Sequence, residues 1–202
     1  MNLPAFYMNQ LDLMRKPIPK PMTLTEKPAS YYDKIYAGSQ KYKAPYQDSV
    51  YYPLWLKIAE WIPERSTTVL DVGCGTGQLC SMLKSSGYLH VTGIDFSQEA
   101  IATAKKTCSA IFKVADLYSF SLYEFYETLI LTEVLEHLEQ DVALMKRINW
   151  QHVIFSVPSF DDPAHVRTYK SLADIKQRYP LLNITRSCSY KKWFLIEVNG
   201  SK

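Results

Sequence analysis

With 202 residues, the chain has the length of one ordinary domain and can bury a core of its own. Its residues are 47% hydrophobic and 21% charged, and no apolar run reaches the roughly 18 to 20 residues that a membrane span requires. The absence of a long apolar run excludes an integral membrane protein. The net charge of +3 is too small to indicate a nucleic-acid-binding surface, which disfavours nucleic acid as a partner.

The N-terminal segment is predicted to be a flexible arm over 1–30. Residues 1–43 carry seven Lys or Arg and only three Asp or Glu, and four prolines within 15–28 favour an extended chain. A signal peptide has a basic segment ahead of an apolar stretch, and residues 1–10 do not show this pattern. We therefore expect a cytoplasmic protein.

A tyrosine-rich segment follows the arm and leads into a predicted helix. Seven tyrosines lie within 31–52, and apolar residues recur at helical spacing over 52–61. We interpret 31–64 as a helical cap that packs on a larger unit.

From residue 65 onward, short apolar runs alternate with helical segments. We predict strands at 69–72, 91–95, 111–115, 129–132 and 153–157, helices at 76–85, 98–107, 141–147 and 172–178, and a closing pair of strands at 184–190 and 193–198. The first five strands are continuously apolar, as in a parallel sheet buried on both sides. The sequence therefore predicts the α/β class: a Rossmann-like, seven-stranded, mostly parallel sheet over 65–202, with helices on both faces and a C-terminal antiparallel hairpin.

The four cysteines offer no zinc site. Cys74, Cys80, Cys108 and Cys188 contain no C-x-x-C pair. We expect reduced thiols that act as small hydrophobic side chains.

A glycine-rich loop, V-L-D-V-G-C-G-T-G-Q-L over 69–79, joins a buried strand to a helix. Glycines let a ligand lie against the backbone at a helix N-terminus. A dinucleotide fingerprint would put a glycine at position 78, where this chain has Gln78, so an NAD-dependent oxidoreductase is disfavoured. A glycine turn used only for packing is the structural alternative.

The run D-V-G-C-G-T-G resembles motif I of class I S-adenosylmethionine-dependent methyltransferases. In that family the loop passes under the amino-acid and ribose portions of S-adenosylmethionine. The resemblance implies that this cofactor is held by Asp71, Gly73, Cys74, Gly75 and Gly77.

Two further acidic residues follow the next two predicted strands. Asp95 is placed to accept hydrogen bonds from both ribose hydroxyls, with Phe96 flanking the adenine. Asp116 resembles the acidic residue of the family near the adenine amino group, with Leu117 as an apolar contact. Three acids at successive strand ends agree with ligand binding at the carboxyl edge of an open α/β sheet.

The run L-T-E-V-L-E-H-L over 131–138 closely resembles the motif after the fourth strand in ubiquinone-biosynthesis-type O-methyltransferases. The resemblance implies that Thr132 and Glu133 face the methionine end of the cofactor. Glu136 and His137 have a structural alternative as the first turn of a helix, where carboxylates favour the helix dipole.

A metal-binding alternative arises in the same segment. Glu133, Glu136 and His137 could surround a divalent cation, as in metal-using relatives that include small-RNA 3′-terminal 2′-O-methyltransferases. Many relatives with the same residues do not need a metal, so the leading interpretation assigns no metal ligand.

The fifth predicted strand ends in S-V-P-S-F-D-D-P-A-H-V-R over 156–167, which resembles a signature of a bacterial subset of these enzymes. His165 is the first candidate for the general base, because a neutral imidazole can take a hydroxyl proton, and His137 is the second. A histidine that only orders the loop is the alternative. His90 and His152, beside strand starts, are interpreted as structural.

The predicted function is methyl transfer from S-adenosylmethionine to an oxygen, or with less support a nitrogen, of a small metabolite or sugar. In the resemblance, the tyrosine-rich segment is the cap over the cofactor, and Tyr31, Tyr32 and Tyr42 are candidate ligand contacts, although aromatic packing explains them as well. One alternative is a metal-assisted RNA 2′-O-methyltransferase, although this sequence has no evident aromatic platform for RNA. The other is a cofactor-binding module without catalytic activity. A monomer or homodimer is expected.

Overall fold

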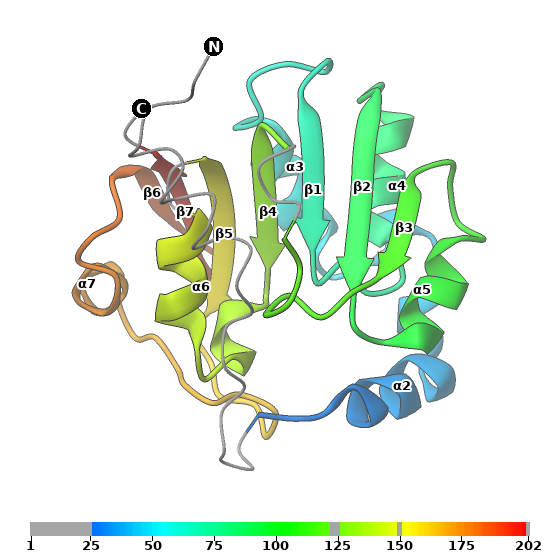
Figure 1. The fold of residues 1–202 in the computed structure, drawn as a ribbon, viewed down its shortest axis with the longest axis horizontal. Helices are drawn as coiled ribbons and strands as arrows, with labels where there is room; N and C mark the ends of the chain where they lie inside the picture. The colour runs from blue at the N-terminus through cyan, green and yellow to red at the C-terminus, as the bar shows by residue number, and fades with distance from the viewer. Residues whose placement is uncertain (1–25, 122–125, 149–150, 201–202) are drawn as a thin grey trace.

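The computed structural model describes residues 26–121, 126–148 and 151–200, and Figure 1 draws the remainder as a grey trace. Most of the arm predicted over 1–30 therefore lies outside the described residues. Within these ranges, every helix is too short or too polar to cross a lipid bilayer.

The described residues form one seven-stranded sheet in the order β3-β2-β1-β4-β5-β7-β6, which confirms the predicted fold class (Figure 1). The strands are β1 (Thr68–Val72), β2 (His90–Asp95), β3 (Ile111–Val114), β4 (Thr128–Thr132), β5 (His152–Pro158), β6 (Ile184–Tyr190) and β7 (Trp193–Asn199). Strands β1 to β5 pair in parallel, and β7 inserts antiparallel between β5 and β6. The strand order reverses between β1 and β4, which is where ligands bind in open sheets of this kind.

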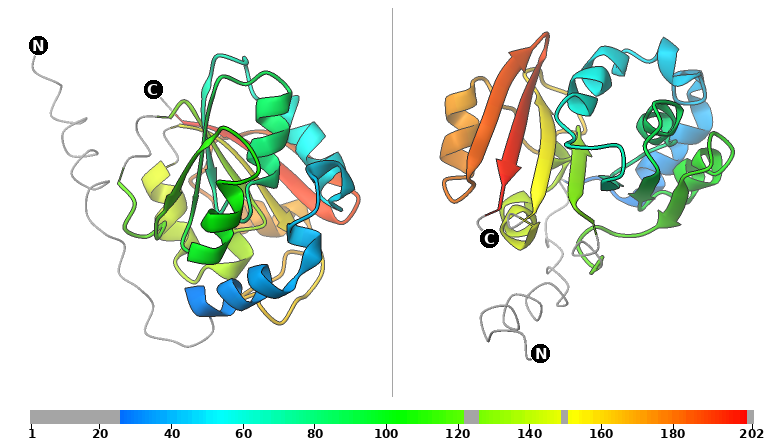
Figure 2. Two further views of the ribbon diagram at one scale, coloured as in Figure 1. Left: turned by 90° about the vertical axis from the view of Figure 1, so that its right-hand side faces the viewer. Right: turned by 90° about the horizontal axis from the view of Figure 1, so that it is seen from above.

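Helices cover both faces of the sheet, as seen from above in Figure 2. One layer consists of α3 (Tyr52–Ala59), α4 (Gln78–Ser85) and α5 (Gln98–Ala104), and the other of α6 (Asp141–Ile148) and α7 (Leu172–Arg178). Helix α2 (Ala29–Gly38) lies beyond the carboxyl ends of the strands, at the bottom of Figure 1, and packs on α5. This position puts α2 over the edge where a ligand is expected.

Alternate residues of each strand supply the two cores. On β4, Leu129 and Leu131 join the core under α6 and α7, and Ile130 joins the core under α3 and α4. Since neighbouring side chains of a strand point to opposite faces, a strand buried on both sides has to be apolar at every position. The continuous apolar runs in the sequence have this cause.

The predicted element boundaries differ from the structure mainly at the glycine loop and in the cap. Helix α4 begins at Gln78, two residues after the predicted start, because Gly75 and Gly77 have positive φ angles of 52° and 78°. Helix α2 was not predicted; it has no buried residue, so it lacks a clear apolar stripe.

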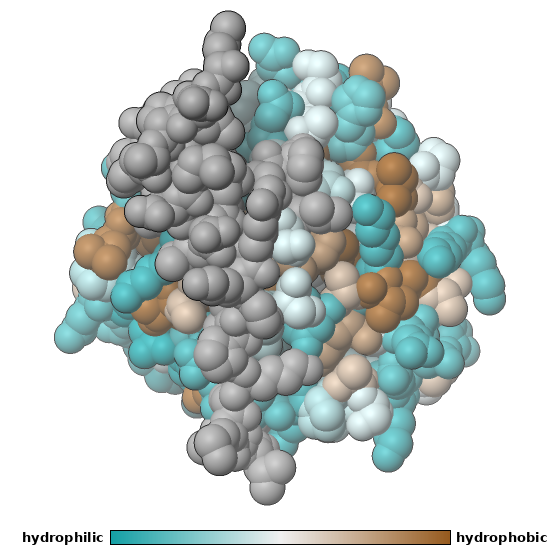
Figure 3. Space-filling model, in the orientation of Figure 1, coloured by the Kyte–Doolittle hydropathy of each residue, from teal (hydrophilic) through white to brown (hydrophobic). Residues whose placement is uncertain are grey.

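The edge strand β3 is partly apolar on its outer side. Ile111 and Val114 are exposed, and the face shown in Figure 3 carries apolar side chains around β3. The exposed Lys113 between them places a charge on this edge, as many sheet proteins do to discourage pairing with another chain.

Candidate functional site

A cavity of about 1130 Å³ opens at the carboxyl ends of β1, β2, β3 and β4. Its walls come from α2, from the loop after each of these strands and from the loop after β5. This volume slightly exceeds the range of roughly 300–1,000 Å³ that is typical of small-molecule sites. The cavity is therefore large enough for a cofactor together with a small acceptor.

The glycine loop forms one wall of the cavity. The backbone N–H groups of Gly73 and Cys74 donate to the carbonyl of Ile94 at 2.8 and 2.9 Å, which ties the loop to β2. A Cβ on Gly75 would lie 3.1 Å from the hydroxyl oxygen of Tyr36, so glycine lets the loop approach α2 closely.

Gly77 has a different role in the loop. A Cβ there would lie 2.8 Å from Phe112 and 3.0 Å from Ala104, and Gly77 is not among the described residues that line the cavity. The glycine lets the start of α4 pack against β3 and α5.

Asp95 is fixed at the end of β2 by two backbone donors. Its Oδ2 accepts from the N–H of Gly75 at 2.9 Å, and its Oδ1 accepts from the N–H of Ser97 at 2.9 Å. Burial raises the pKa of Asp95 to about 6, and these two hydrogen bonds oppose the rise. The carboxylate lines the cavity and is held in one orientation.

Asp71 lies at the floor of the cavity. It is buried, and burial raises its pKa to about 7 although the Cys80 thiol donates to its Oδ2 at 3.4 Å. All four cysteines are free thiols, and burial raises the thiol pKa of Cys74 and Cys80. These two thiols act as packing groups, as predicted.

The predicted adenine contacts lie along one side of the cavity. Phe96, Asp116 and Leu117 all line it, and the N–H of Tyr118 donates to the Oδ1 of Asp116 at 3.0 Å. The ring of Tyr32 from α2 lies 5.3 Å from the ring of Phe96. An aromatic pair thus stands where a flat ligand group can pack.

Polar side chains tie the cap to the cofactor loop, a role that the sequence did not reveal. The amide nitrogen of Gln78 donates to the carbonyls of Lys41 and Ala44 at 3.2 and 2.7 Å. Thr76 Oγ1 donates to the carbonyl of Tyr42 at 2.5 Å. The residue that replaces a dinucleotide-type glycine therefore fastens the cap.

Asp33 makes a second tie between the cap and the core. Its Oδ1 accepts from Ser97 Oγ at 2.6 Å and from the N–H of Glu99 at 3.3 Å, at the start of α5.

The three tyrosines predicted as ligand contacts, Tyr31, Tyr32 and Tyr42, all line the cavity. Tyr36 lines it as well, although the sequence did not single it out.

The far end of the cavity is formed by residues after β4. Glu133 has a positive φ of 56°, and its carboxylate accepts from Ser156 Oγ and from the indole N–H of Trp193, each at 2.9 Å. Burial raises the pKa of Glu133 to about 7, although both hydrogen bonds act to lower it. Thr132 also lines the cavity, and its buried hydroxyl has no hydrogen-bond partner in the described part of the chain.

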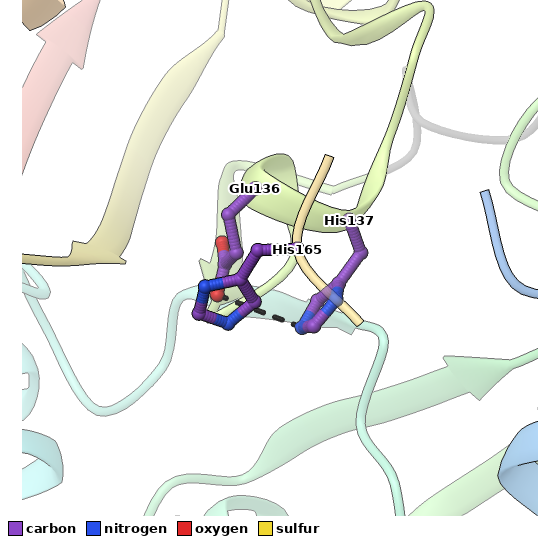
Figure 4. A group of neighbouring side chains, drawn as sticks. All are labelled: Glu136, His137 and His165. Atoms are coloured by element: carbon purple, nitrogen blue, oxygen red, sulfur yellow. Dashed lines mark ion pairs between the residues drawn. The ribbon is translucent and has the colours of Figure 1, made fainter. Parts of the chain in front are cut away.

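Glu136, His137 and His165 converge beside this end of the cavity (Figure 4). One ligand atom from each lies within 4.8 Å of the other two. Glu136 is fully buried, and neither carboxylate oxygen has a hydrogen-bond partner among residues 26–121, 126–148 and 151–200; His137 Nε2 is 3.7 Å from its Oε1. The cluster differs from the Glu133, Glu136 and His137 set considered from sequence, because it contains His165 and Glu133 is held by Ser156 and Trp193.

The two imidazoles of this cluster are neutral bases. His137 Nδ1 lies 3.0 Å from the carbonyl of Ala164, which requires the proton on Nδ1 and leaves the lone pair on Nε2. Burial lowers the pKa of both His137 and His165. His165 Nδ1 is buried and unpaired within the described chain.

Arg167 holds the turn that carries Glu136 and His137. Its guanidinium donates to the carbonyls of Leu135 and Leu138 and lies 3.2 Å from the buried carboxylate of Asp141. The remaining two histidines, which were interpreted as structural, lie away from the cavity. His152 forms hydrogen bonds with Thr128 and Glu197, and His90 is exposed.

A protein-family model described as a methyltransferase domain matches residues 69–150. The ubiquinone biosynthesis O-methyltransferase of Bradyrhizobium diazoefficiens is 36% identical over 84 residues, which cover 39% of this chain and 33% of that protein. The chain spans about a third of the length of the curated relatives it matches.

Solved structures share the fold at low sequence identity. A Haloferax volcanii protein, solved in complex with the Trm112 methyltransferase activator, aligns with a TM-score of 0.71 at 13% identity, covering 85% of this chain and 98% of that one. The magnesium protoporphyrin IX methyltransferase of Synechocystis, solved with bound S-adenosylhomocysteine, has a TM-score of 0.54 at 18% identity and covers 98% and 95% of the two chains.

Proposed function

We propose that this chain, whose core has the fold and glycine loop of class I S-adenosylmethionine-dependent methyltransferases, binds S-adenosylmethionine and transfers its methyl group to an oxygen of a small metabolite or sugar. One observation carries the proposal: the Asp95 carboxylate is fastened to the glycine loop through Gly75 at the switch point of the sheet. The division into a cap over 31–64 and a core over 65–202 is part of this proposal.

The volume and the lining of the cavity support the proposed cofactor. The backbone of Gly73 and Gly75 lines the cavity, and Asp95 and Asp116 offer carboxylate oxygens to hydroxyl and amino donors. The proposed cofactor-binding residues are Asp71, Gly73, Cys74, Gly75, Gly77, Asp95, Phe96, Asp116, Leu117, Thr132 and Glu133. Gly77 contributes by shaping the loop, since it packs behind it.

When bound, S-adenosylmethionine supplies an activated methyl carbon, so that a C–O bond forms while the C–S bond breaks and its electron pair stays on sulfur. His165 is the proposed acceptor of the hydroxyl proton, with His137 beside it, because both line the cavity as neutral imidazoles. The protein otherwise aligns the acceptor and excludes water, which is the larger part of such catalysis.

A small hydroxyl compound is the acceptor class that the cavity supports best. The cap contributes Tyr31, Tyr32, Tyr42 and Tyr51 to the lining of a half-open cavity, whose volume suits a compact substrate beside the cofactor. The local similarity to an O-methyltransferase supports oxygen over nitrogen.

Calorimetric titration of the metal-stripped protein with S-adenosylmethionine tests the proposal. We expect saturable binding that weakens about 100-fold in Asp95→Asn, because a charge-assisted pair of hydrogen bonds is lost. Asp48→Asn, at an exposed position off the cavity, is the matched control and retains wild-type affinity. A folded protein that does not bind S-adenosylmethionine contradicts the proposal. An acceptor screen then compares small hydroxyl compounds, amines and an RNA with a 3′-terminal diol.

A further inference from the structure

We infer that Glu136, His137 and His165 bind one divalent cation at the acceptor end of the cavity. Their ligand atoms lie within 4.8 Å of one another. Two ligands that share an ion at about 2.1 Å are at most about 4.2 Å apart, so a small side-chain rotation closes the set around one ion. Figure 4 shows the three side chains pointing toward a common space.

The buried carboxylate of Glu136 is the strongest evidence for a cation. Both of its oxygens lie without a hydrogen bond in the described chain, at zero exposure. The ionised form of a carboxylate in such a place is strongly disfavoured unless a positive charge faces it. Arg167, whose charge acts on Glu136 only weakly, already engages two carbonyls and Asp141. A bound cation provides the missing charge.

Both imidazoles are prepared to act as ligands. The Ala164 carbonyl fixes the Nδ1 proton of His137 and turns its Nε2 lone pair toward Glu136, which is the arrangement found behind many metal-bound histidines. The ring of His165 lies 5.0 Å from that of His137, and its Nδ1 is buried without a partner in the described residues.

The backbone joins the two segments that carry these ligands. The N–H of Val166 donates to the carbonyl of Glu136 at 2.8 Å, so the His165 loop is fastened to the turn that bears Glu136 and His137. Arg167 braces the same turn through Leu135 and Leu138. The three ligands are therefore held together before any ion binds.

The donor set selects the kind of ion. Two imidazole nitrogens and one carboxylate suit first-row transition metals such as Mn²⁺ or Co²⁺ better than Mg²⁺, which prefers oxygen ligands and an octahedral shell. Three protein ligands leave coordination positions open toward the cavity.

The role of the ion rests on the proposed function. An acceptor hydroxyl that binds the ion becomes more acidic. Its proton then leaves to a solvent base, its oxygen forms the bond to the methyl carbon, and the C–S bond breaks with its electron pair on sulfur. With the ion bound, His137 and His165 are ligands, and this role replaces the general-base role that the metal-free site gives to His165. A pair of adjacent hydroxyls fills two open positions at once.

Titration of the metal-stripped, full-length protein with Co²⁺, followed by visible absorption, tests the site without any methylation assay. We expect one ion per chain and bands typical of Co²⁺ with nitrogen and oxygen ligands. Glu136→Gln and His165→Asn are expected to weaken binding at least 100-fold, whereas the exposed control His90→Asn leaves it unchanged. Mg²⁺ is expected to compete poorly.

Thermal unfolding separates loss of the site from loss of the fold. Co²⁺ is expected to raise the unfolding temperature of the wild type and of His90→Asn, and to leave that of Glu136→Gln unchanged. Wild-type protein that binds no Co²⁺, or binding that survives in both ligand variants, overturns the inference. Cofactor binding without metal binding refutes only the cation site, and metal binding without cofactor binding refutes only the proposed function.

Discussion

The two ends of the cavity satisfy their polar groups differently. At the cofactor end, both oxygens of Asp95 accept backbone N–H groups, and the glycine loop is tied to β2 through Ile94. At the acceptor end, Thr132 Oγ1, both oxygens of Glu136 and His165 Nδ1 are unpaired within the described chain. One end is complete in the protein alone, and the other is arranged for partners that come from outside.

This difference has a physical meaning. Unpaired buried polar groups destabilise a fold by about 1–3 kcal/mol each, so they persist where a ligand uses them. A pre-bonded site binds a fixed ligand, whereas a site with unpaired groups is completed by its substrate or ion. The substitutions and the pH change described below test this difference between the two ends of the cavity.

The largest expected effect is on the packing behind the cofactor loop. Gly77→Ala adds a Cβ that lies 2.8 Å from Phe112, at a residue with a φ of 78°. Left-handed strain of about 1–2 kcal/mol and overpacking of about 1–3 kcal/mol predict a loss of roughly 2–5 kcal/mol in the free energy of unfolding. Chemical denaturation measures it, with Gly38→Ala as the control, since nothing lies within 4 Å of a Cβ there. Equal stability of both variants would show that the loop is not rigidly packed.

A pH effect is expected next in size. The pKa of Asp95 is raised by burial from 3.8 to about 6, with Asp33 also raising it. In the proposed site the ribose hydroxyls donate to the ionised form, so S-adenosylmethionine affinity is expected to fall about tenfold per pH unit below pH 6. The same shift means that ionised Asp95 opposes folding, so its stability contribution is full below pH 3.8 and lost as the pH rises through 6. Calorimetry between pH 4.5 and 8 checks the affinity, and Asp95→Asn should remove this dependence.

The tie between cap and loop is expected to have a moderate effect. Gln78→Ala removes two hydrogen bonds to Lys41 and Ala44, each worth about 0.5–1.5 kcal/mol. We expect cofactor dissociation to accelerate about tenfold, as stopped-flow fluorescence can measure, because the cap opens more often. Gln47→Ala, at an exposed position, is the control. An unchanged dissociation rate would mean that the bonds of Thr76 and Asp33 hold the cap without Gln78.

The smallest effect is expected at the acceptor end. Thr132→Val replaces an unpaired buried hydroxyl by a methyl group of similar size. The ligand-free protein is expected to gain up to about 1 kcal/mol in stability, whereas S-adenosylmethionine affinity falls a few-fold. If the stability of Thr132→Val and its affinity for S-adenosylmethionine both rise or both fall, the proposed difference between the two ends is wrong.

The fold, and the gathering of Asp95, Asp116 and the glycine loop at one cavity, were predictable because their signals are local. Strands buried on both faces leave continuous apolar runs, and a turn such as that at Gly75 leaves glycines that no other residue replaces easily. The acids after β2 and β3 follow the same rule of strand ends.

The acceptor end and the cap were less predictable because their partners are distant in sequence. His165 meets His137 across 28 positions, and Trp193 meets Glu133 across 60. The sequence pointed to Glu136 and His137 as candidates for a cation set, but not to the bonds of Ser156 and Trp193 with Glu133 or to the position of His165 beside the other two. The bounds of helix α2 were missed because none of its residues is buried, which leaves no clear apolar stripe in the sequence.

The hydrogen bond from Trp193 to Glu133 gives the molecule an internal optical probe. An indole whose N–H faces a carboxylate emits at a wavelength that depends on the local electric field. A ligand or ion that changes the field around Glu133 will therefore change the emission of Trp193. Subtracting the spectrum of Trp193→Phe isolates this signal from the other tryptophans. Events at the acceptor end can thus be timed in the unlabelled protein, without knowledge of the product.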